Sequence, residues 1–303
     1  DGKIASVDFR RADGSTGTAR GKVVVVAAHA IETPRLLLNS AQEGAENGVA
    51  NASDQVGRNL MDHPTKLSWA LAPEPVWPYR GPLSTSGIEN LRDGEFRKDR
   101  AAFRIEIGND GHAWPTGAPI STAARFAQDG LRGEELDAAI KDETSRHIRL
   151  ASLVEQSPDA ENRVTLDPDK KDVNGMPLPR IHFDYDDYTR AGLDAAQEAH
   201  DEVFAAVGAT DVNHSPDVQG AGHVIGTLRM GTDPKTSVVD PDLRSFEHRN
   251  LFLLGSGTFP TSATANPSLT IAALSLRAVD AISKTASEQQ ERPGKFAAPA
   301  SPG

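Results

Sequence analysis

An uninterrupted run of valines, Val23 to Val26, constrains the fold of this chain more than any other feature. The stretch Lys22 to Ala28 shows no polar alternation, which is typical of a parallel-sheet strand buried on both faces. A helix pattern follows at once, with Thr33 as a candidate cap, Pro34 in the first turn, and apolar positions at Leu36, Leu37, Leu38 and Ala41. Strand, turn and helix in this order predict a piece of an open α/β sheet.

Two further segments support this sheet. Residues Lys3 to Arg11, followed by Asp13-Gly14-Ser15, predict a hairpin before the valine run. Near the other end, Asn250 to Leu254 predict a second buried strand, closed by Gly255-Ser256-Gly257. Asn266-Pro267 then opens a long helix, whose expected core-facing stripe is Leu269, Ala272, Ala273, Leu276, Val279 and Ile282.

The region between these segments has a different pattern. Strand-like runs occur at Phe103–Ile107, Arg149–Val154, Arg163–Leu166 and Ile181–Tyr185, and helix patterns at Gly133–Lys141 and Tyr188–Val207. We expect a mixed sheet with helices on it, inserted as a second module between two pieces of the first. The polar stretch 287–303, with its Pro and Gly residues, predicts a disordered tail.

Composition excludes several classes of function. The net charge of -11 argues against a nucleic-acid partner, and the absence of cysteine excludes zinc–thiolate sites and cysteine nucleophiles. The sequence has no H-E-x-x-H or clustered histidines for a metal, no G-x-S-x-G nucleophile turn, and no apolar run long enough for a transmembrane segment. Any targeting signal would lie upstream of Asp1, so both a periplasmic and a cytoplasmic location remain open.

One segment, Gly220 to Gly231, carries the chemical signal. Its Gly-x-Gly spacing is not a dinucleotide fingerprint, because no clear strand precedes it and Thr232-Asp233-Pro234 prevents a following helix. We interpret its glycines as sites of close backbone approach. His223 lies among them, either as a structural histidine bonded to nearby backbone or as a catalytic base whose small neighbours leave the imidazole uncrowded.

Asn266 is the second candidate. An asparagine before a proline at a helix start is an ordinary N-cap. The same position can also serve a site, because a helix N-terminus offers free N–H groups and partial positive charge to a ring system that becomes anionic on reduction. Both interpretations stay open at this point.

Five segments, in order, resemble the glucose–methanol–choline (GMC) oxidoreductases. They are Val23–Ser40, Val56–Pro64, Glu155–Leu166, His223–Gly231 with Val238-Val239-Asp240, and Asn250–Ile282. Within that family, the Glu-Thr-Pro after the valine run and the Asn-Pro-x-Leu-Thr helix start look most like the bacterial sugar and sugar-acid dehydrogenases.

The resemblance implies FAD and the oxidation of a CH–OH group of a sugar, sugar acid or polyol to a carbonyl by hydride transfer to flavin. It also implies an electron acceptor or partner subunit. His223 takes the position of the base, and Asn266 that of its partner on the substrate hydroxyl; a neutral histidine and a donating amide suit these roles. By the same resemblance the flavin is lined by Ala27, Ala28, Gly255, Ser256, Asn266, Pro267 and Ser268.

The implied fold is α/β plus α+β. Residues 1–58 and 232–286 correspond to a partial FAD-binding Rossmann-like domain, and residues 59–231 to the inserted mixed-sheet substrate-binding domain. Two departures from the family pattern stand out: Gly255 replaces an aspartate of many members, and the G-x-G-x-x-G turn with its first strand is missing and would lie upstream of Asp1. We therefore expect this polypeptide alone to bind FAD poorly. The alternative is an inactive fragment or scaffold that needs a separate N-terminal FAD-binding segment.

Overall fold

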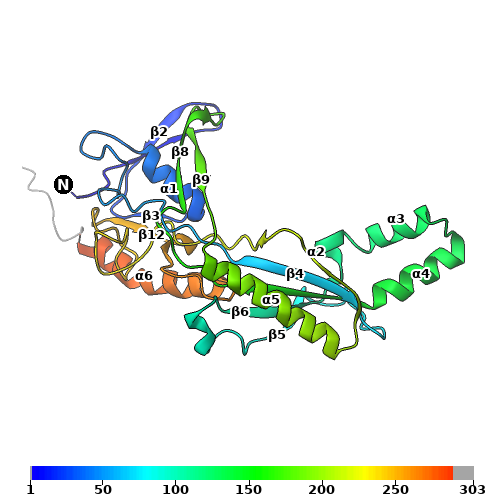
Figure 1. Cartoon of the computed structure of the whole chain (residues 1–303). Coiled ribbons are helices and arrows are strands. Elements are labelled where there is room, and N and C mark those ends of the chain that lie inside the picture. The colour runs from blue at the N-terminus through cyan, green and yellow to red at the C-terminus, as the bar shows by residue number, and fades with distance from the viewer. Residues whose placement is uncertain (1, 289–303) are drawn as a thin grey trace, which may run out of the picture.

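The computed structural model describes residues 2–288, and its first part gathers both ends of this stretch (Figure 1). Strands β1 (Val7–Arg10) and β2 (Thr16–Ala19) form the predicted hairpin. Strands β3 (Val24–Val26) and β12 (Leu251–Leu253) pair in parallel, with Val24 opposite Leu251. Helices α1 (His29–Asn39) and α6 (Ser268–Glu288) pack beside them around one apolar core. The α/β character predicted for these segments is confirmed.

The predicted burial of the valine strand on both faces is wrong. Val24 and Val26 are half-buried, and the side chain of Val25 is 45% exposed. Among the described strands β3 pairs only with β12, so its outer face lacks the cover that a wider sheet would give it. A valine run therefore identified the strand correctly and overstated how much of it is covered within residues 2–288.

Helix α1 begins earlier than the sequence predicts. Its first residue is His29, so Thr33 lies inside the helix and its Oγ1 accepts a hydrogen bond from the Ala28 N–H at 3.1 Å. Pro34 also lies inside the helix and has no N–H for the carbonyl of Ala30. The hydroxyl of Thr227 donates to that carbonyl at 2.6 Å, which satisfies it and ties α1 to the Gly220–Gly231 segment.

Most of the predicted core stripe of α6 faces outward, and of its six residues Ile282 packs on the core. Leu269 and Leu276 are 82% and 73% exposed, whereas Ala278 is fully buried and Leu274 packs on the core. Helix α6 has apolar residues on two sides, and periodicity alone does not say which side meets the core. The disordered tail predicted from residue 287 is wrong at its start, because Ser287 and Glu288 still belong to α6. The rest of the predicted tail, residues 289–303, lies outside the described part of the chain.

The second part of the molecule is a sheet covered by helix α5 (Asp187–Ala206) (Figure 1). Its strand order is β10 (Thr210–His214), β4 (Pro64–Leu71), β7 (His147–Val154), β6 (Phe103–Gly108), β5 (Ser84–Ile88), and β11 (Gln219–Gly220) pairs with the start of β4. All these pairs are antiparallel, so the sheet is not mixed as predicted. Asp186 caps α5, accepting from the Thr189 N–H at 2.8 Å.

Another hairpin lies between the two parts. Strands β8 (Arg163–Lys171) and β9 (Pro177–His182) lie beside α1, where Arg35 donates to the Pro177 carbonyl and pairs with Asp172 at 2.7 Å (Figure 1). The strand predicted at Ile181–Tyr185 therefore lies several residues earlier, over a Pro-Leu-Pro sequence. A two-stranded hairpin tolerates these prolines because one edge of each strand needs no donors. The domain limits at residues 58 and 231 stay a prediction.

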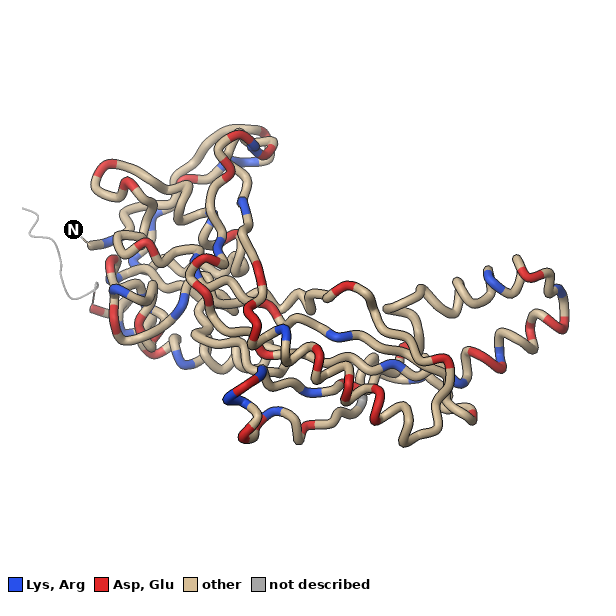
Figure 2. Tube along the Cα trace, viewed as in Figure 1, with Lys and Arg blue, Asp and Glu red and all other residues tan. Residues whose placement is uncertain are grey.

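A two-helix arm extends from one end of the sheet (Figure 1). After the short helix α2 (Ala113–Thr116), α3 (Ile120–Gln128) and α4 (Gly133–Ser145) run side by side, joined by an ion pair between Arg125 and Glu143. Figure 2 shows acidic residues along α4 and acidic and basic residues interspersed elsewhere. Two short 3₁₀ turns, η1 (Glu95–Lys98) and η2 (Ser256–Thr258), complete the fold. No helix within residues 2–288 combines the length and apolar character needed to span a bilayer.

Candidate active site

The predicted cofactor-lining residues follow the ends of two paired strands. Because β3 and β12 are parallel, their carboxyl ends share one edge; Ala27 and Ala28 follow β3, and Gly255 and Ser256 follow β12. The Leu254 N–H donates to the Val26 carbonyl at 2.9 Å, which holds the two turns together. Ligands of open α/β sheets bind outside this edge. The structure therefore brings these four residues to one place.

The edge has room for a flat group. Gly255 has φ of +108°, and a Cβ added to it would meet nothing within 4 Å. Ala27 and Ala28 are exposed and present only methyl groups to this surface. Small residues around open space fit the close approach of a ring system such as the flavin of FAD. Pro267 is buried, and Ser268 is the first residue of α6.

The His223 segment runs along the turn that follows β12. The Ser256 hydroxyl donates to the Val224 carbonyl at 2.6 Å, and the N–H groups of Leu228 and Met230 donate to the carbonyls of Gly257 and Thr258 at 2.7 and 2.9 Å. Gly226, at φ +96°, lies so close to the carbonyl of Asn59 that a Cβ there would overlap it. The close backbone approach that the sequence predicts for the glycines of this segment is confirmed at Gly226, whereas a Cβ at Gly222 would meet nothing within 4 Å.

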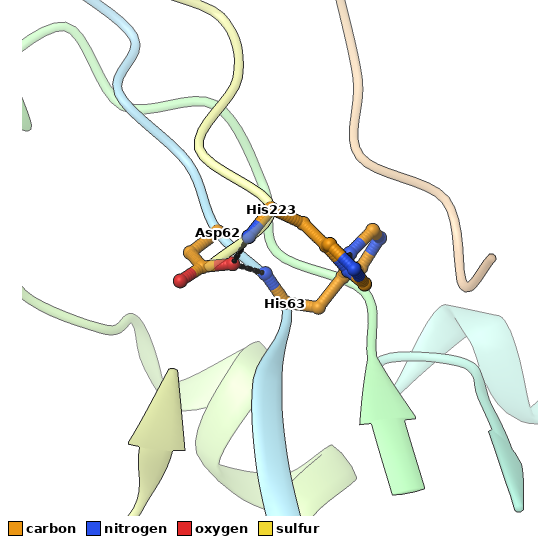
Figure 3. Close-up of side chains that lie close together, drawn as sticks. All are labelled: Asp62, His63 and His223. Atoms are coloured by element: carbon orange, nitrogen blue, oxygen red, sulfur yellow. Dashed lines mark hydrogen bonds between the residues drawn. The ribbon is translucent and has the colours of Figure 1, made fainter. Parts of the chain in front are cut away.

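Asp62 and His63 hold His223 in place (Figure 3). One carboxylate oxygen of Asp62 accepts from the N–H groups of both His63 and His223 at 2.7 Å, and the other accepts from the Gly222 N–H at 3.1 Å. The Nδ1 atoms of the two imidazoles are 2.9 Å apart, and the rings meet edge to face. The Nε2 of His63 lies 3.1 Å from the Ser262 carbonyl oxygen. A half-buried imidazole is therefore fixed by a fully buried one.

Burial dominates the electrostatics of this pair. It lowers the pKa of His63, whose ring is fully buried, and a second imidazole nearby adds to the effect. Burial also lowers the pKa of His223, partly offset by the carboxylates of Asp62 and Glu106. Both rings are accordingly neutral at pH 7, the state that a proton acceptor needs.

Asp62, His63 and His223 are also the group with metal-ligand spacing among residues 2–288. Their lone pairs and protons are engaged with each other: the carboxylate oxygens accept from three backbone N–H groups, and the two Nδ1 atoms share one hydrogen bond. Two imidazoles bound to one zinc ion would need Zn–N distances of about 2.0–2.1 Å to each ring instead of direct contact between them. The group is better described as a hydrogen-bond network.

Asn266 reaches toward the sheet. Its side chain is exposed, and its Oδ1 accepts a long hydrogen bond of 3.5 Å from Arg104 on β6. Arg104 pairs with Glu89 and Glu106 at 3.2 and 3.3 Å, and Glu106 also acts on the pKa of His223. Asn266 thus contacts an ion pair whose carboxylate, Glu106, raises the pKa of His223.

Sequence reasoning had missed four residues of this site: Asp62, His63, Arg104 and Glu106. Asp62 and His63 lie in the Val56–Pro64 segment, where an adjacent Asp and His before a strand could have indicated a functional site. Arg104 and Glu106 gave no signal, since alternating charges on a strand usually mark a solvated face.

Comparison with known proteins shows the family of this chain. Models of the GMC oxidoreductase family match residues 1–65 and 158–275. This chain belongs to the GMC oxidoreductases. The large subunit of fructose dehydrogenase from Gluconobacter japonicus is 37% identical over 280 residues, covering 92% of this chain and 50% of that protein. The 2-methyl-1,2-propanediol dehydrogenase of Mycolicibacterium austroafricanum is 28% identical, covering 95% of this chain and 53% of its own length.

Solved structures give the same fold. Pyridoxine 4-oxidase from Mesorbium loti superposes with a TM-score of 0.59 at 19% identity, covering 97% of this chain and 56% of that one. Formate oxidase superposes with a TM-score of 0.65 at 17% identity, covering 95% and 59%. GMC oxidoreductases are FAD-dependent enzymes that act on sugars and alcohols, and this chain spans about half the length of the relatives it matches.

Proposed function

We propose that this GMC oxidoreductase oxidises a CH–OH group of a sugar, sugar acid or polyol to a carbonyl, with His223 as the base and Asn266 as the partner on the substrate hydroxyl. The observation that carries the proposal is the packing of the His223 segment against the turn after β12, through Ser256, Gly257 and Thr258. A neutral imidazole thereby borders the edge where two parallel strands end.

FAD, when bound, would supply the acceptor for the hydride of the substrate carbon. Ala27, Ala28, Gly255 and Ser256 would line it at the strand edge, and Asn266, Pro267 and Ser268 at the start of α6. The fit rests on the open space at Gly255 and on the small exposed side chains of the two alanines.

The chain's own residues would perform the proton chemistry. His223 takes the hydroxyl proton, which makes the neighbouring C–H a better hydride donor. The Asn266 amide donates a hydrogen bond to the same oxygen as negative charge develops there. Arg104 contacts the Oδ1 of Asn266, which leaves the amide NH₂ available for that donation.

The name of the relative from Gluconobacter japonicus describes a large subunit. We accordingly propose a partner subunit or an external electron acceptor for this protein. The inactive-fragment alternative also stays a prediction, and the flavin content of purified residues 1–303 tests it.

The test of the catalytic proposal replaces His223 in the FAD-loaded protein. We expect His223→Gln to lower kcat for sugar or polyol oxidation by about 10²–10⁴-fold, the usual contribution of a positioned acid–base group. His182→Gln, at an exposed histidine of β9, is the matched control and should leave turnover unchanged. Normal turnover in His223→Gln, measured across a panel of sugars and sugar acids, would refute the assignment.

A further inference from the structure

The orientation of His63 is set by an atom that can only accept. The His63 Nε2 lies 3.1 Å from the main-chain carbonyl oxygen of Ser262, and a carbonyl has no proton to offer. The hydrogen bond therefore requires a proton on Nε2 of His63. Ser262 is itself fixed, because its hydroxyl accepts from the Gln156 N–H at 2.8 Å.

The rest of the His63 ring follows from its burial. The side chain is fully buried, and burial lowers its pKa, so the ring is neutral near pH 7. A neutral imidazole carries one proton, and Nε2 already holds it. The Nδ1 of His63 is accordingly a lone pair that faces the Nδ1 of His223 at 2.9 Å.

The same logic then fixes His223. A hydrogen bond between the two Nδ1 atoms needs one proton, and His63 has none there, so His223 must supply it. Since His223 is also neutral, its Nε2 is left unprotonated. Nε2 is the ring atom of His223 that is free of the network, and it has the lone pair that a base requires.

We propose that His63 is a positioning residue that holds His223 in the tautomer protonated at Nδ1, and so keeps Nε2 ready to accept the substrate's hydroxyl proton. The inference rests on the proposed role of His223 and adds a residue to which the sequence analysis assigned no role. His63 does not touch substrate, because no part of its side chain is exposed. Asp62 assists by fixing the main chain of both histidines.

His63 also stabilises the protonated form of His223, because its Nδ1 accepts a hydrogen bond from that ring. When the hydroxyl proton arrives at Nε2, His223 becomes an imidazolium with protons on both nitrogens, and its Nδ1–H still donates to the Nδ1 of His63. No proton needs to move between the rings. The carboxylates of Asp62 and Glu106, whose charges raise the pKa of His223, favour the cation.

The first test measures the tautomer directly. Nitrogen-15 NMR of the FAD-loaded protein, labelled in histidine, distinguishes protonated from unprotonated ring nitrogens. The spectrum of His223→Gln identifies the His223 signals by difference. We expect Nδ1 protonated and Nε2 unprotonated at pH 7.5; a proton on Nε2 of His223 would overturn the inference. The result does not depend on turnover, so failure of the catalytic proposal is recognised separately by an active His223→Gln protein.

The second test removes the acceptor and then restores it. His63→Leu offers no lone pair to His223, whereas His63→Asn can offer its Oδ1 near the position of the former Nδ1. We expect His63→Leu to lower kcat by at least about tenfold with little change in KM, because a mis-set tautomer impairs the base without affecting binding. His63→Asn should recover most of that loss. Equal kcat in both variants and the wild type would contradict the proposal, and should His63→Leu not fold, the NMR result and His63→Asn decide.

Discussion

Two clusters of histidines in this protein use the same groups and differ in their access to solvent. In the first, Asp62, His63 and His223 meet at the loop beside β12 (Figure 3). In the second, Asp201 pairs with His214 at 3.1 Å, and a chain of hydrogen bonds of 2.7–2.8 Å continues from His214 through Ser68 and His200 to Ser152. The second cluster contains Asp, His and Ser in the order of a hydrolase triad.

Exposure separates the two. Ser68, Ser152 and His200 are 0% exposed, so no substrate reaches the hydroxyl of Ser68, and that hydroxyl is shared between two rings. His223, by contrast, is half-buried and leaves Nε2 outside the network. The second cluster links α5 to strands β4, β7 and β10, so its function is structural. Hydrogen-bond geometry alone would have assigned both clusters to catalysis.

Replacing His200 should have the largest effect on stability and tests whether the second cluster is structural. We expect His200→Leu to lower the free energy of unfolding by about 2–4 kcal/mol, because the hydroxyls of Ser68 and Ser152 lose their buried partners. Denaturant unfolding of the FAD-loaded protein measures it. Asp201→Asn, at the exposed end of the same chain, is the control and should cost less than about 1 kcal/mol. A stable His200→Leu protein with reduced kcat would reverse the roles of the two clusters.

The second cluster should also make the folded protein less stable in acid. Burial lowers the pKa of His200 to about 3, whereas in the unfolded chain its pKa returns to about 6.5. Below pH 6.5 the unfolded state takes up a proton that the folded state refuses, so stability falls as pH falls from 6.5 toward 3. We expect a loss of about 1–2 kcal/mol between pH 7 and pH 5, seen as a lower Tm. His200→Leu should show a smaller slope over this range, and an equal slope would assign the effect to other groups.

Asn266 provides the smallest and most selective test. We expect Asn266→Ala to lower kcat by about tenfold, through loss of a hydrogen bond to the developing alkoxide, and to change the free energy of unfolding by less than about 0.5 kcal/mol. The stability expectation follows from its exposed side chain and its single long contact with Arg104. Lys284→Ala, exposed on α6, should change neither quantity. Destabilisation without loss of kcat would assign Asn266 a structural role ahead of α6.

Much of the first part of the fold could be predicted from local patterns. The β1–β2 hairpin, the β3 and β12 strands and the start of α6 lie within a few residues of their predicted positions, because turn residues and apolar runs act over short distances. Strand β4 and helix α3 were not predicted. The register of the strands and their order in the sheet could be determined only from the folded structure.

By itself, the sequence determined that His223 lies in a glycine-rich segment, that Asn266-Pro267 opens a long helix, and that the chain resembles one oxidoreductase family. Tertiary structure alone decided which face of α6 is buried and which histidine cluster is accessible. It also brought His63 against His223 across 160 residues of chain. The physical reason is that propensity and periodicity are properties of neighbouring residues, whereas the protonation of a ring nitrogen depends on whichever distant atom the fold sets beside it.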